Sequence, residues 1–140
     1  MSQSLTYHIQ KIETIAKKLL FNTKKKIWLL EGEVGVGKTT LIKALCKALG
    51  VKDIVQSPSF TTVHVYTIKN KADVYHFDFY HTLDNSTKNT LSIYEEYFDQ
   101  NCYCFVEWPH KNLQTYFDID YVYLRLLYIS NTERSLSIKL

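Results

Sequence analysis

The stretch Gly32-Glu33-Val34-Gly35-Val36-Gly37-Lys38-Thr39 decides the fold of this chain. It fits the pattern G-x-x-x-x-G-K-[ST] completely, and we refer to residues 32–39 as the P-loop. Glycines let the backbone curl so that consecutive N–H groups point inward, and the helix that follows adds its positive end, so the stretch predicts phosphate binding. Lys38 is expected to reach the β and γ phosphates of a nucleotide as a point charge, and the Thr39 hydroxyl to bind Mg²⁺. Glu33 and Val34 only have to avoid crowding the loop.

The sequence on either side of the P-loop supplies the strand and the helix that this motif requires. Residues 27–31 form a short continuous apolar run, which is typical of a buried parallel strand. Residues 40–49 contain good helix formers without Gly or Pro, and Gly50 stands where a helix C-terminal glycine is expected. Upstream, apolar residues recur at helical spacing over residues 5–21, which predicts an amphipathic helix there.

The rest of the chain predicts further strands and one short helix. Apolar runs rich in β-branched and aromatic residues, separated by turn residues, indicate where they lie. They are a hairpin of residues 61–68 and 74–79 with its turn at 69–71, a helix at 91–98, a strand at 102–108, and final strands at 119–129 and 135–140 joined by a turn at 130–133. We therefore expect an α/β fold: a single P-loop NTPase domain over residues 1–140, with a mixed central β-sheet flanked by helices.

Composition excludes several classes of protein. With 46% hydrophobic and 22% charged residues in 140, the chain can bury a core and is neither disordered nor of low complexity. No apolar run approaches the roughly 18 residues of a membrane span, and residues 1–13 lack an apolar signal core, so we expect a cytoplasmic protein without a membrane partner. Cys46, Cys102 and Cys104 are an odd number without C-x-x-C spacing, so neither a disulfide framework nor a zinc site is expected, and Cys102 and Cys104, two apart in an apolar run, are predicted to be core residues on one face of a strand.

Charge is unevenly distributed along the chain, although the net charge is only +3. Residues 1–52 hold ten lysines against three acidic residues, whereas residues 53–120 hold four lysines against ten. This polarity suits an anionic ligand at the basic end, or else a solvated lysine-rich surface around residues 24–26. Those lysines could meet RNA phosphates, but no interleaving of aromatic and basic residues supports base recognition, and we expect no DNA partner.

Two acidic residues follow apolar strands and are candidates for the metal or the attacking water. Asp78 ends the run 74–77, and Glu107 ends the run 102–106. Either alone could be an ordinary strand-end acid, but the pair indicates that at least one is functional. A metal cluster of His76, Asp78 and His81 is set aside because the P-loop already accounts for a metal.

A second nucleotide motif is set aside as well. Residues 70–73 (NKAD) resemble the guanine-reading N-K-x-D of GTPases, but they fall in the predicted hairpin turn, before the candidate metal carboxylates rather than after them. No D-x-x-G accompanies them. Asn, Lys and Asp are also good turn residues, which explains the stretch without a nucleotide.

Five segments in one order carry a resemblance to a known family. They are residues 32–40 (GEVGVGKTT), 57–61 (SPSFT), 76–80 (HFDFY), 95–99 (EEYFD) and 106–109 (VEWP). In this order they resemble the small bacterial ATPases of the TsaE (YjeE) type, which are required for making threonylcarbamoyladenosine beside the anticodon of certain tRNAs. The resemblance covers residues 32–109, and the helix predicted before them also suits the family.

The resemblance implies roles for individual residues, with ATP or ADP and Mg²⁺ as cofactors. Thr39 and Glu107 would be the Mg²⁺ ligands, and Asp78 an essential carboxylate near the γ-phosphate, so that Lys38, Asp78 and Glu107 form the catalytic set. Residues 57–61 would be a switch-like loop that responds to nucleotide; the alternative is a plain Pro-containing connection. The expected nucleotide contacts are Gly32, Glu33, Val34, Gly35, Val36, Gly37, Lys38, Thr39 and Thr40, with Trp108 beside the site (or packed in the core) and Thr6 and Arg134 near the adenine.

The resemblance also implies a function. The chain would be an ATPase that binds a two-protein threonylcarbamoyl-transfer complex, meets tRNA only indirectly, and resets the complex by ATP hydrolysis between rounds. Three departures from the family concern Ser59, which usually is Thr; His81, which usually is Arg; and His110, which usually is acidic. Without an arginine at position 81 we expect hydrolysis to be slow alone and accelerated by the partners.

Two other classes of function stay open from the sequence. A small-molecule P-loop kinase usually needs a lid with several arginines, and this chain has only Arg125 and Arg134. A nucleotide-gated binding module that never hydrolyses ATP is opposed by the presence of both Asp78 and Glu107. A turnover assay separates the latter from an ATPase.

Overall fold

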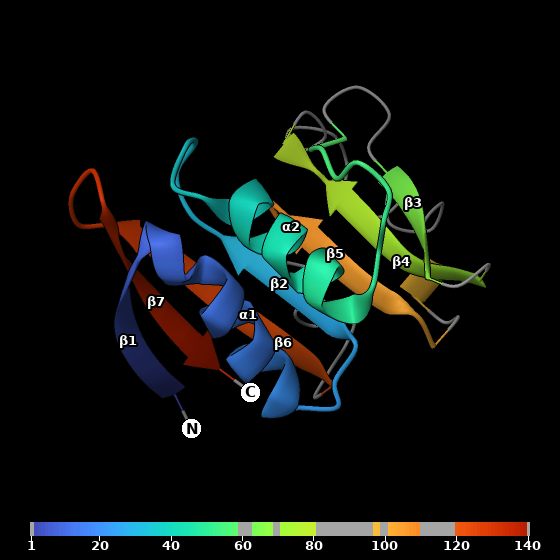
Figure 1. Ribbon diagram of the computed structural model, residues 1–140, viewed down its shortest axis with the longest axis horizontal. Helices are drawn as coiled ribbons and strands as arrows, with labels where there is room; N and C mark the ends of the chain where they lie inside the picture. The colour runs from blue at the N-terminus through green and yellow to red at the C-terminus, as the bar shows by residue number, and fades with distance from the viewer. Residues whose placement is uncertain are drawn as a thin grey trace.

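A seven-stranded mixed β-sheet forms the centre of the molecule (Figure 1). The computed structural model describes residues 2–58, 63–68, 71–80, 97–98, 101–109 and 120–139. The strands are β1 (Ser2–His8), β2 (Ile27–Glu31), β3 (Val63–Ile68), β4 (Lys71–Asp78), β5 (Tyr103–Glu107), β6 (Tyr121–Tyr128) and β7 (Glu133–Lys139), in the order β1-β7-β6-β2-β5-β4-β3. The predicted α/β class with a mixed sheet is confirmed.

Four neighbouring strands run in the same direction at the centre of the sheet. β2 pairs in parallel with both β5 and β6, and β5 pairs in parallel with β4. The outer strands are antiparallel to their neighbours: β3 to β4, β7 to β6 and β1 to β7. The carboxyl ends of β2, β4 and β5 therefore meet at one edge, where open α/β sheets usually bind their ligands.

Two helices, α1 (Ile12–Phe21) and α2 (Lys38–Leu49), lie side by side over one face of the sheet (Figure 1). Side chains alternate along the strands, so Trp28 and Leu30 of β2 join the core under the helices, while Leu29 joins a second cluster on the opposite face. That second cluster is rich in aromatic rings, with Phe77 stacked on Phe79 at 5.7 Å between centroids. Because β2 is buried on both faces, its sequence is apolar without alternation.

The helix predicted for residues 5–21 is wrong in its first part. Residues 2–8 form the strand β1, a 3₁₀ turn follows at Ile9–Lys11, and the α-helix begins only at Ile12. The strand forms because β1 pairs with β7, which turns Tyr7 into the core with only 4% of its surface exposed. The His8 side chain then accepts a hydrogen bond from the backbone N–H of Gln10 at 3.1 Å and starts the helical turn.

The remaining elements agree with the sequence, with shifts at their ends. α2 begins at Lys38, two residues before the predicted start, and Gly50 terminates it in the left-handed conformation with φ of 97°. The predicted hairpin is confirmed as β3 and β4, but β4 already begins at Lys71, so three residues of the NKAD stretch lie in a strand. Of the helix predicted at 91–98, only residues 97–98 are described, and they are helical.

The cysteines and the helices bear on two further expectations. Cys46 and Cys104 are fully buried and have no disulfide partner, and burial raises the pKa of each thiol to about 12. The core position predicted for Cys104 is confirmed, whereas Cys102 is half-buried and packs against the second cluster. Within the described ranges, neither helix is long and apolar enough to cross a bilayer.

Candidate functional site

The P-loop connects the carboxyl end of β2 to the first turn of α2. A Cβ added at Gly32 would come within 2.7 Å of the Val36 side chain and 2.9 Å of the Leu126 carbonyl oxygen on β6, so no side chain fits there. Gly37 has φ of 112°, which L-residues with a side chain rarely adopt. These two glycines of the motif therefore have a steric reason, independent of any ligand.

Lys38 is the first residue of α2 and is only 5% exposed. Its ammonium group donates hydrogen bonds to the carbonyl oxygens of Gly32 and Glu33, the latter at 2.9 Å. Burial lowers the pKa of Lys38 below its ordinary value, while the carboxylates of Glu107, Asp78 and Glu33 oppose that shift. The P-loop thus curls around a positive charge that faces acidic side chains.

Thr39 and Glu107 are in direct contact where α2 meets the end of β5. The Thr39 hydroxyl lies 2.8 Å from Glu107 Oε1 and 3.0 Å from Oε2. Glu107 is only 3% exposed, and its Oε2 also accepts a hydrogen bond from His76 Nε2 at 2.6 Å. A hydroxyl and a carboxylate are hard oxygen donors of the kind that Mg²⁺ prefers, so this pair fits the expected metal.

The described side chains contain no self-sufficient metal cage. No group of three or more His, Cys, Asp or Glu residues is arranged to hold an ion among them. Of the cluster set aside above, His76 is bonded to Glu107, Asp78 is bonded to Ser57, and His81 lies outside the described residues.

Asp78 stands level with Glu107 on the neighbouring strand. The two are register partners in the parallel pair β4–β5, and the Phe79 N–H donates to the Glu107 carbonyl at 3.1 Å. Asp78 Oδ1 accepts from the Tyr80 N–H at 2.9 Å, and Oδ2 accepts from the Ser57 hydroxyl at 2.7 Å. Ser57 opens the switch-like segment 57–61, of which residues 59–61 lie outside the described residues. Asp78 therefore touches the start of that segment.

Trp108 lies beside Lys38, directly after Glu107 in the chain. Its ring centroid is 4.3 Å from the Lys38 ammonium and 4.9 Å from the Tyr80 ring. The residue is half-buried and belongs to neither core cluster. Its φ of 53° lies in the left-handed region, which residues other than Gly adopt only rarely. Trp108 therefore lies beside the P-loop lysine rather than within either core cluster.

Arg134 and Thr6 differ in how closely they approach the P-loop. Arg134 Nε donates to the Val36 carbonyl oxygen at 2.8 Å, and its guanidinium lies 4.6 Å from the ring centre of Tyr128. Thr6 is exposed on the edge strand β1, where its register partner is Ser135 of β7. The structure thus brings Arg134 to the P-loop, while Thr6 lies one strand further out.

The other P-loop positions divide by exposure. Three of them are exposed at the tip of the loop, Val36 is buried with 2% of its surface accessible, and Thr40 is exposed in the first turn of α2. The three exposed positions are Glu33, Val34 and Gly35.

Sequence reasoning missed the residues behind Glu107. His76 Nδ1 lies 3.2 Å from the Tyr66 hydroxyl, which in turn lies 3.1 Å from the Gln56 carbonyl oxygen. A signal for His76 was present, because side chains two apart on a strand point to the same face. His76 and Asp78 of the H-x-D stretch therefore face the same side of β4. The contact with Tyr66 depends on the register between β3 and β4, which cannot be read from the sequence.

Comparison with known proteins decides the family. Residues 6–136 match the family model described as "Threonylcarbamoyl adenosine biosynthesis protein TsaE". The chain belongs to the TsaE family. The resemblance stated for residues 32–109 is thereby confirmed and extends over nearly the whole chain.

Relatives of this TsaE-family chain include bacterial proteins named "tRNA threonylcarbamoyladenosine biosynthesis protein TsaE". The one from Haemophilus influenzae is 36% identical over 94 residues, covering 66% of this chain and 58% of the relative. The one from Bacillus subtilis is 41% identical over 81 residues, covering 58% of this chain and 49% of the relative. The matched part of the chain thus spans about half the length of these relatives.

A solved structure supports the fold. The crystal structure of YdiB from Bacillus subtilis superposes with a TM-score of 0.67 at 24% sequence identity, covering 99% of this chain and 86% of that one. At this identity the likeness establishes the shared architecture of the TsaE-family chain and YdiB.

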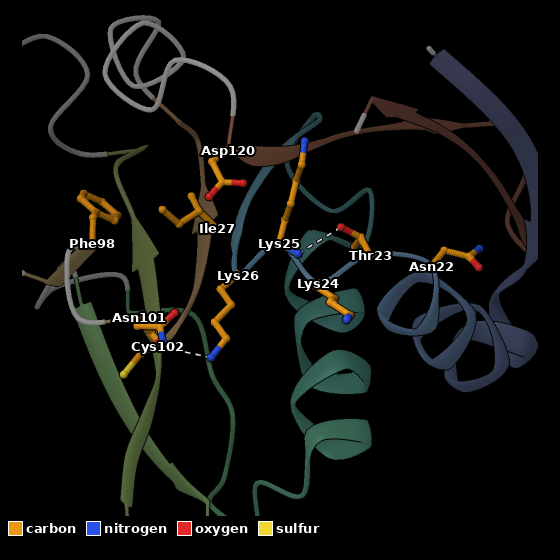
Figure 2. A pocket seen from close by; sticks show the side chains of 10 residues that line it. All are labelled: Asn22, Thr23, Lys24, Lys25, Lys26, Ile27, Phe98, Asn101, Cys102 and Asp120. Carbon is orange, nitrogen blue, oxygen red and sulfur yellow. Dashed lines mark hydrogen bonds between the residues drawn. The ribbon is translucent and has the colours of Figure 1, made fainter.

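Two hollows of different size lie at opposite edges of the sheet in this TsaE-family chain. The smaller, about 200 Å³, adjoins the P-loop and is lined by Gly32, Glu33, Trp108 and Arg125 among others. The larger, about 800 Å³, lies where β2, β5 and β6 begin (Figure 2). Its lining residues are Asn22, Thr23, Lys24, Lys25, Lys26, Ile27, Phe98, Asn101, Cys102 and Asp120.

Proposed function

We propose that this chain is an ATPase that binds ATP with Mg²⁺ and supports the threonylcarbamoyladenosine modification of tRNA. One observation carries the proposal: the Thr39 hydroxyl meets the Glu107 carboxylate at the first turn of α2, next to the buried Lys38 ammonium. A P-loop lysine, a hydroxyl and a strand-end carboxylate are the groups from which P-loop NTPases build their nucleotide site.

Each of these groups has a distinct task in the proposed site. The P-loop N–H groups and Lys38 would hold the β and γ phosphates, and Thr39 with Glu107 would hold the metal. Bound Mg²⁺ would neutralise charge on the phosphate oxygens as the bond to the γ-phosphorus breaks. Asp78, level with Glu107 at the same edge, would orient the water that attacks the γ-phosphate. Trp108 would border the nucleotide, and Arg134 would shape the P-loop through the Val36 carbonyl.

The biological role extends what the names of the relatives say. Those proteins are named for tRNA threonylcarbamoyladenosine biosynthesis. We infer that this chain acts there as an accessory ATPase in the cytoplasm, binding a two-protein threonylcarbamoyl-transfer complex and resetting it by hydrolysis. Contact with tRNA would be indirect, through that complex.

The proposed hydrolysis is slow in the isolated protein. An arginine that reaches the γ-phosphate raises turnover by about 10³- to 10⁵-fold in related enzymes. Here the Arg134 guanidinium donates to the backbone carbonyls of Val36, Ser130 and Glu133. Arg125 is held within β6. The partner complex would order residues 57–61 or supply the missing charge.

Two measurements test the proposed function. Steady-state ATP turnover, alone and with the partner proteins titrated in, should show a low basal rate and a strong increase. A basal rate of several per second that partners do not change would contradict the accessory role. Depletion of the protein in its source cell, followed by mass spectrometry of tRNA nucleosides, should lower threonylcarbamoyladenosine; an unchanged level would remove the proposed pathway.

The small-molecule kinase has less support than the ATPase. Such enzymes clamp the transferred phosphoryl group with several arginines, and of the two in this chain Arg134 is bonded to backbone carbonyls. A binding module without turnover is separated by the same assay, since it would bind Mg-ATP and release no phosphate.

A further inference from the structure

A chain of buried polar contacts runs from Thr39 behind the site to the segment before Ser57. Glu107 Oε2 contacts His76 Nε2 at 2.6 Å, His76 Nδ1 contacts the Tyr66 hydroxyl at 3.2 Å, and Tyr66 contacts both backbone groups of Gln56. His76 is fully buried, and Tyr66 and Glu107 are each 3% exposed. Polar side chains so far from water are retained only with hydrogen-bond partners.

The chemistry of these atoms orders the chain of contacts. A carboxylate can only accept, so His76 Nε2–H donates a hydrogen bond to Glu107 Oε2, and Nδ1 of the same ring is left as an acceptor. The Tyr66 hydroxyl accepts from the Gln56 N–H at 3.3 Å and lies 3.1 Å from the Gln56 carbonyl oxygen. Burial raises the pKa of Tyr66 to about 12, so the phenol keeps its proton near neutral pH. The hydroxyl has a single proton, which it can donate either to the Gln56 carbonyl oxygen or to His76 Nδ1, so these two contacts share one donor.

The contacts restrict how Glu107 can turn. Oε1 faces the Thr39 hydroxyl, while Oε2 is shared between Thr39 and His76. Without the imidazole, Oε2 would lose its shortest bond in a place that water does not reach, and the carboxylate could rotate away from Thr39. In metal sites, such partners of a ligand orient it, and their loss typically costs about 10- to 100-fold in metal affinity.

Residues 56 and 57 are linked by hydrogen bonds to both carboxylates of the site, those of Asp78 and Glu107. Ser57 donates directly to Asp78 at 2.7 Å, and Gln56, the preceding residue, reaches Glu107 through Tyr66 and His76. Asp78 and Glu107 are themselves register partners on β4 and β5. A shift of residues 56–57 would therefore act on both carboxylates. It would reach Asp78 directly through Ser57, and Glu107 through Tyr66 and His76.

We propose that His76 is a positioning residue that holds the Glu107 carboxylate against Thr39, and that Tyr66 links this pair to Gln56, the residue immediately before the switch-like segment. The proposal rests on the proposed function, in which Thr39 and Glu107 hold the metal of a Mg-nucleotide. His76 touches neither substrate nor metal in this role; it acts through Glu107.

The first experiment measures how much Mg²⁺ strengthens ADP binding. Calorimetry gives the Kd for ADP in EDTA and in excess Mg²⁺, and the ratio isolates the metal term. His76→Ala should reduce this ratio about tenfold or more, toward the value of Glu107→Gln, while the Kd in EDTA stays within about threefold. His76→Gln, whose side-chain amide can still donate toward Glu107, should restore most of the ratio.

Val74→Ala is the matched control for a purely structural effect. Val74 is fully buried, lies two residues before His76 on β4 and packs in the core under the helices. The Val74→Ala variant should lower the melting temperature as His76→Ala does, but it should leave the ratio of the Kd values for ADP in EDTA and in Mg²⁺ unchanged. An equal loss of the ratio in Val74→Ala and His76→Ala, or no rescue by His76→Gln, would overturn the positioning role.

The second experiment tests the link to Gln56. Tyr66→Phe keeps the His76–Glu107 bond and removes both bonds to Gln56, so the Mg²⁺ ratio should hold. Hydrogen exchange of the Gln56 amide should respond to Mg-ADP in the parent protein and not in Tyr66→Phe. An unresponsive amide in the parent, or the same response in both, would overturn the link.

The outcomes separate this proposal from the one on which it rests. If the parent protein bound no ADP, or if Glu107→Gln left the Mg²⁺ ratio unchanged, the proposed nucleotide and metal site would be wrong, and the role of His76 with it. If Glu107→Gln abolished the ratio and His76→Ala did not, the metal site would stand and only the positioning role would fall.

Discussion

The hollows at the two edges of the parallel strands differ in size and in the side chains that surround them. At the carboxyl edge, a small hollow of about 200 Å³ adjoins the P-loop, and the buried Lys38 and Glu107 converge there with the half-buried Thr39. At the amino edge, a hollow of about 800 Å³ is lined by three consecutive lysines, whose side chains point in different directions (Figure 2). The larger hollow lies away from the groups that are equipped for chemistry.

The difference shows what makes a site in this fold. Lys26 at the amino edge is half-buried and donates to the Asn101 carbonyl at 3.0 Å, so its ammonium stabilises a loop. Lys38 at the other edge is held among carbonyls, an aromatic ring and three carboxylates whose charges act on its pKa. Convergence of buried groups, rather than volume or formal charge, distinguishes the candidate site.

The largest effect that would sharpen this comparison is expected at Asp78. Asp78→Asn keeps the size of the side chain and removes its negative charge, so ATP turnover in the presence of partners should fall by about 10²- to 10⁴-fold. Nucleotide affinity should stay within about threefold, because Asp78 is not assigned to binding. A variant with parent turnover would exclude Asp78 from the hydrolysis step.

The next effect is expected for binding at Lys38. Lys38→Ala removes a charge-assisted contact to phosphate, worth about 1.5–3 kcal/mol, so ADP affinity should fall roughly 10- to 100-fold. Lys43→Ala, on the exposed side of the same helix, is the control and should bind ADP like the parent. Equal affinities for all three proteins in calorimetry would contradict the P-loop assignment.

Thr39 should show a smaller and metal-dependent effect. Thr39→Ala removes the hydroxyl that contacts Glu107, and we expect the Mg²⁺-dependent part of ADP affinity to fall about tenfold, with little change in EDTA. Thr39→Ser retains the hydroxyl and should behave like the parent. If Thr39→Ser and Thr39→Ala lose the same share of the Mg²⁺-dependent ADP affinity, the threonine methyl group rather than the hydroxyl is responsible for it.

Tryptophan fluorescence should report on the carboxyl edge. Trp108 lies beside Lys38, whereas Trp28 is fully buried and donates to the Lys25 carbonyl at 2.9 Å. Adding Mg-ADP should therefore change the emission of Trp108 and leave that of Trp28 nearly constant. Trp28→Phe should keep most of the response and Trp108→Phe should lose it; the reverse pattern would place the nucleotide elsewhere.

The smallest effect is expected at the amino edge. A triple substitution of Lys24, Lys25 and Lys26 by Ala should leave ADP affinity within about twofold, because those side chains lie at the other end of β2 and salt weakens interactions between charges more than about 10 Å apart. Calorimetry at two salt concentrations checks this. A tenfold loss at both would show that the amino edge takes part in nucleotide binding and break the comparison.

The sequence predicted best where structure depends on neighbours in the chain. The P-loop with β2 before it and α2 after it is local, and so is the Gly50 end of α2. β1 was mistaken for helix because its strand conformation depends on pairing with β7, more than a hundred residues away. Leu5 and Ile9 stand four apart in the sequence, as helix neighbours do, but one lies in β1 and the other in the 3₁₀ turn.

The same division holds for the candidate site. Asp78 and Glu107 were found because each ends an apolar run, and parallel pairing then sets them level. The contacts of His76 with Tyr66, and of Arg134 with the Val36 carbonyl, depend on which strands become neighbours and in which register. Periodicity in a single sequence carries no information about either. The roles assigned to these residues stay predictions.

The pairing of β1 with β7 sets an order of events during translation. Residues 32–39 leave the ribosome well before Arg134, whose guanidinium holds the Val36 carbonyl, and β1 has no partner until β7 has been synthesised. Until Arg134 has been synthesised, the nascent chain therefore contains the P-loop sequence without the hydrogen bond from Arg134 to the Val36 carbonyl oxygen. Since distant pairings are slow to form, we expect nucleotide binding to be acquired only after residues 133–139 have emerged from the ribosome and paired with β1.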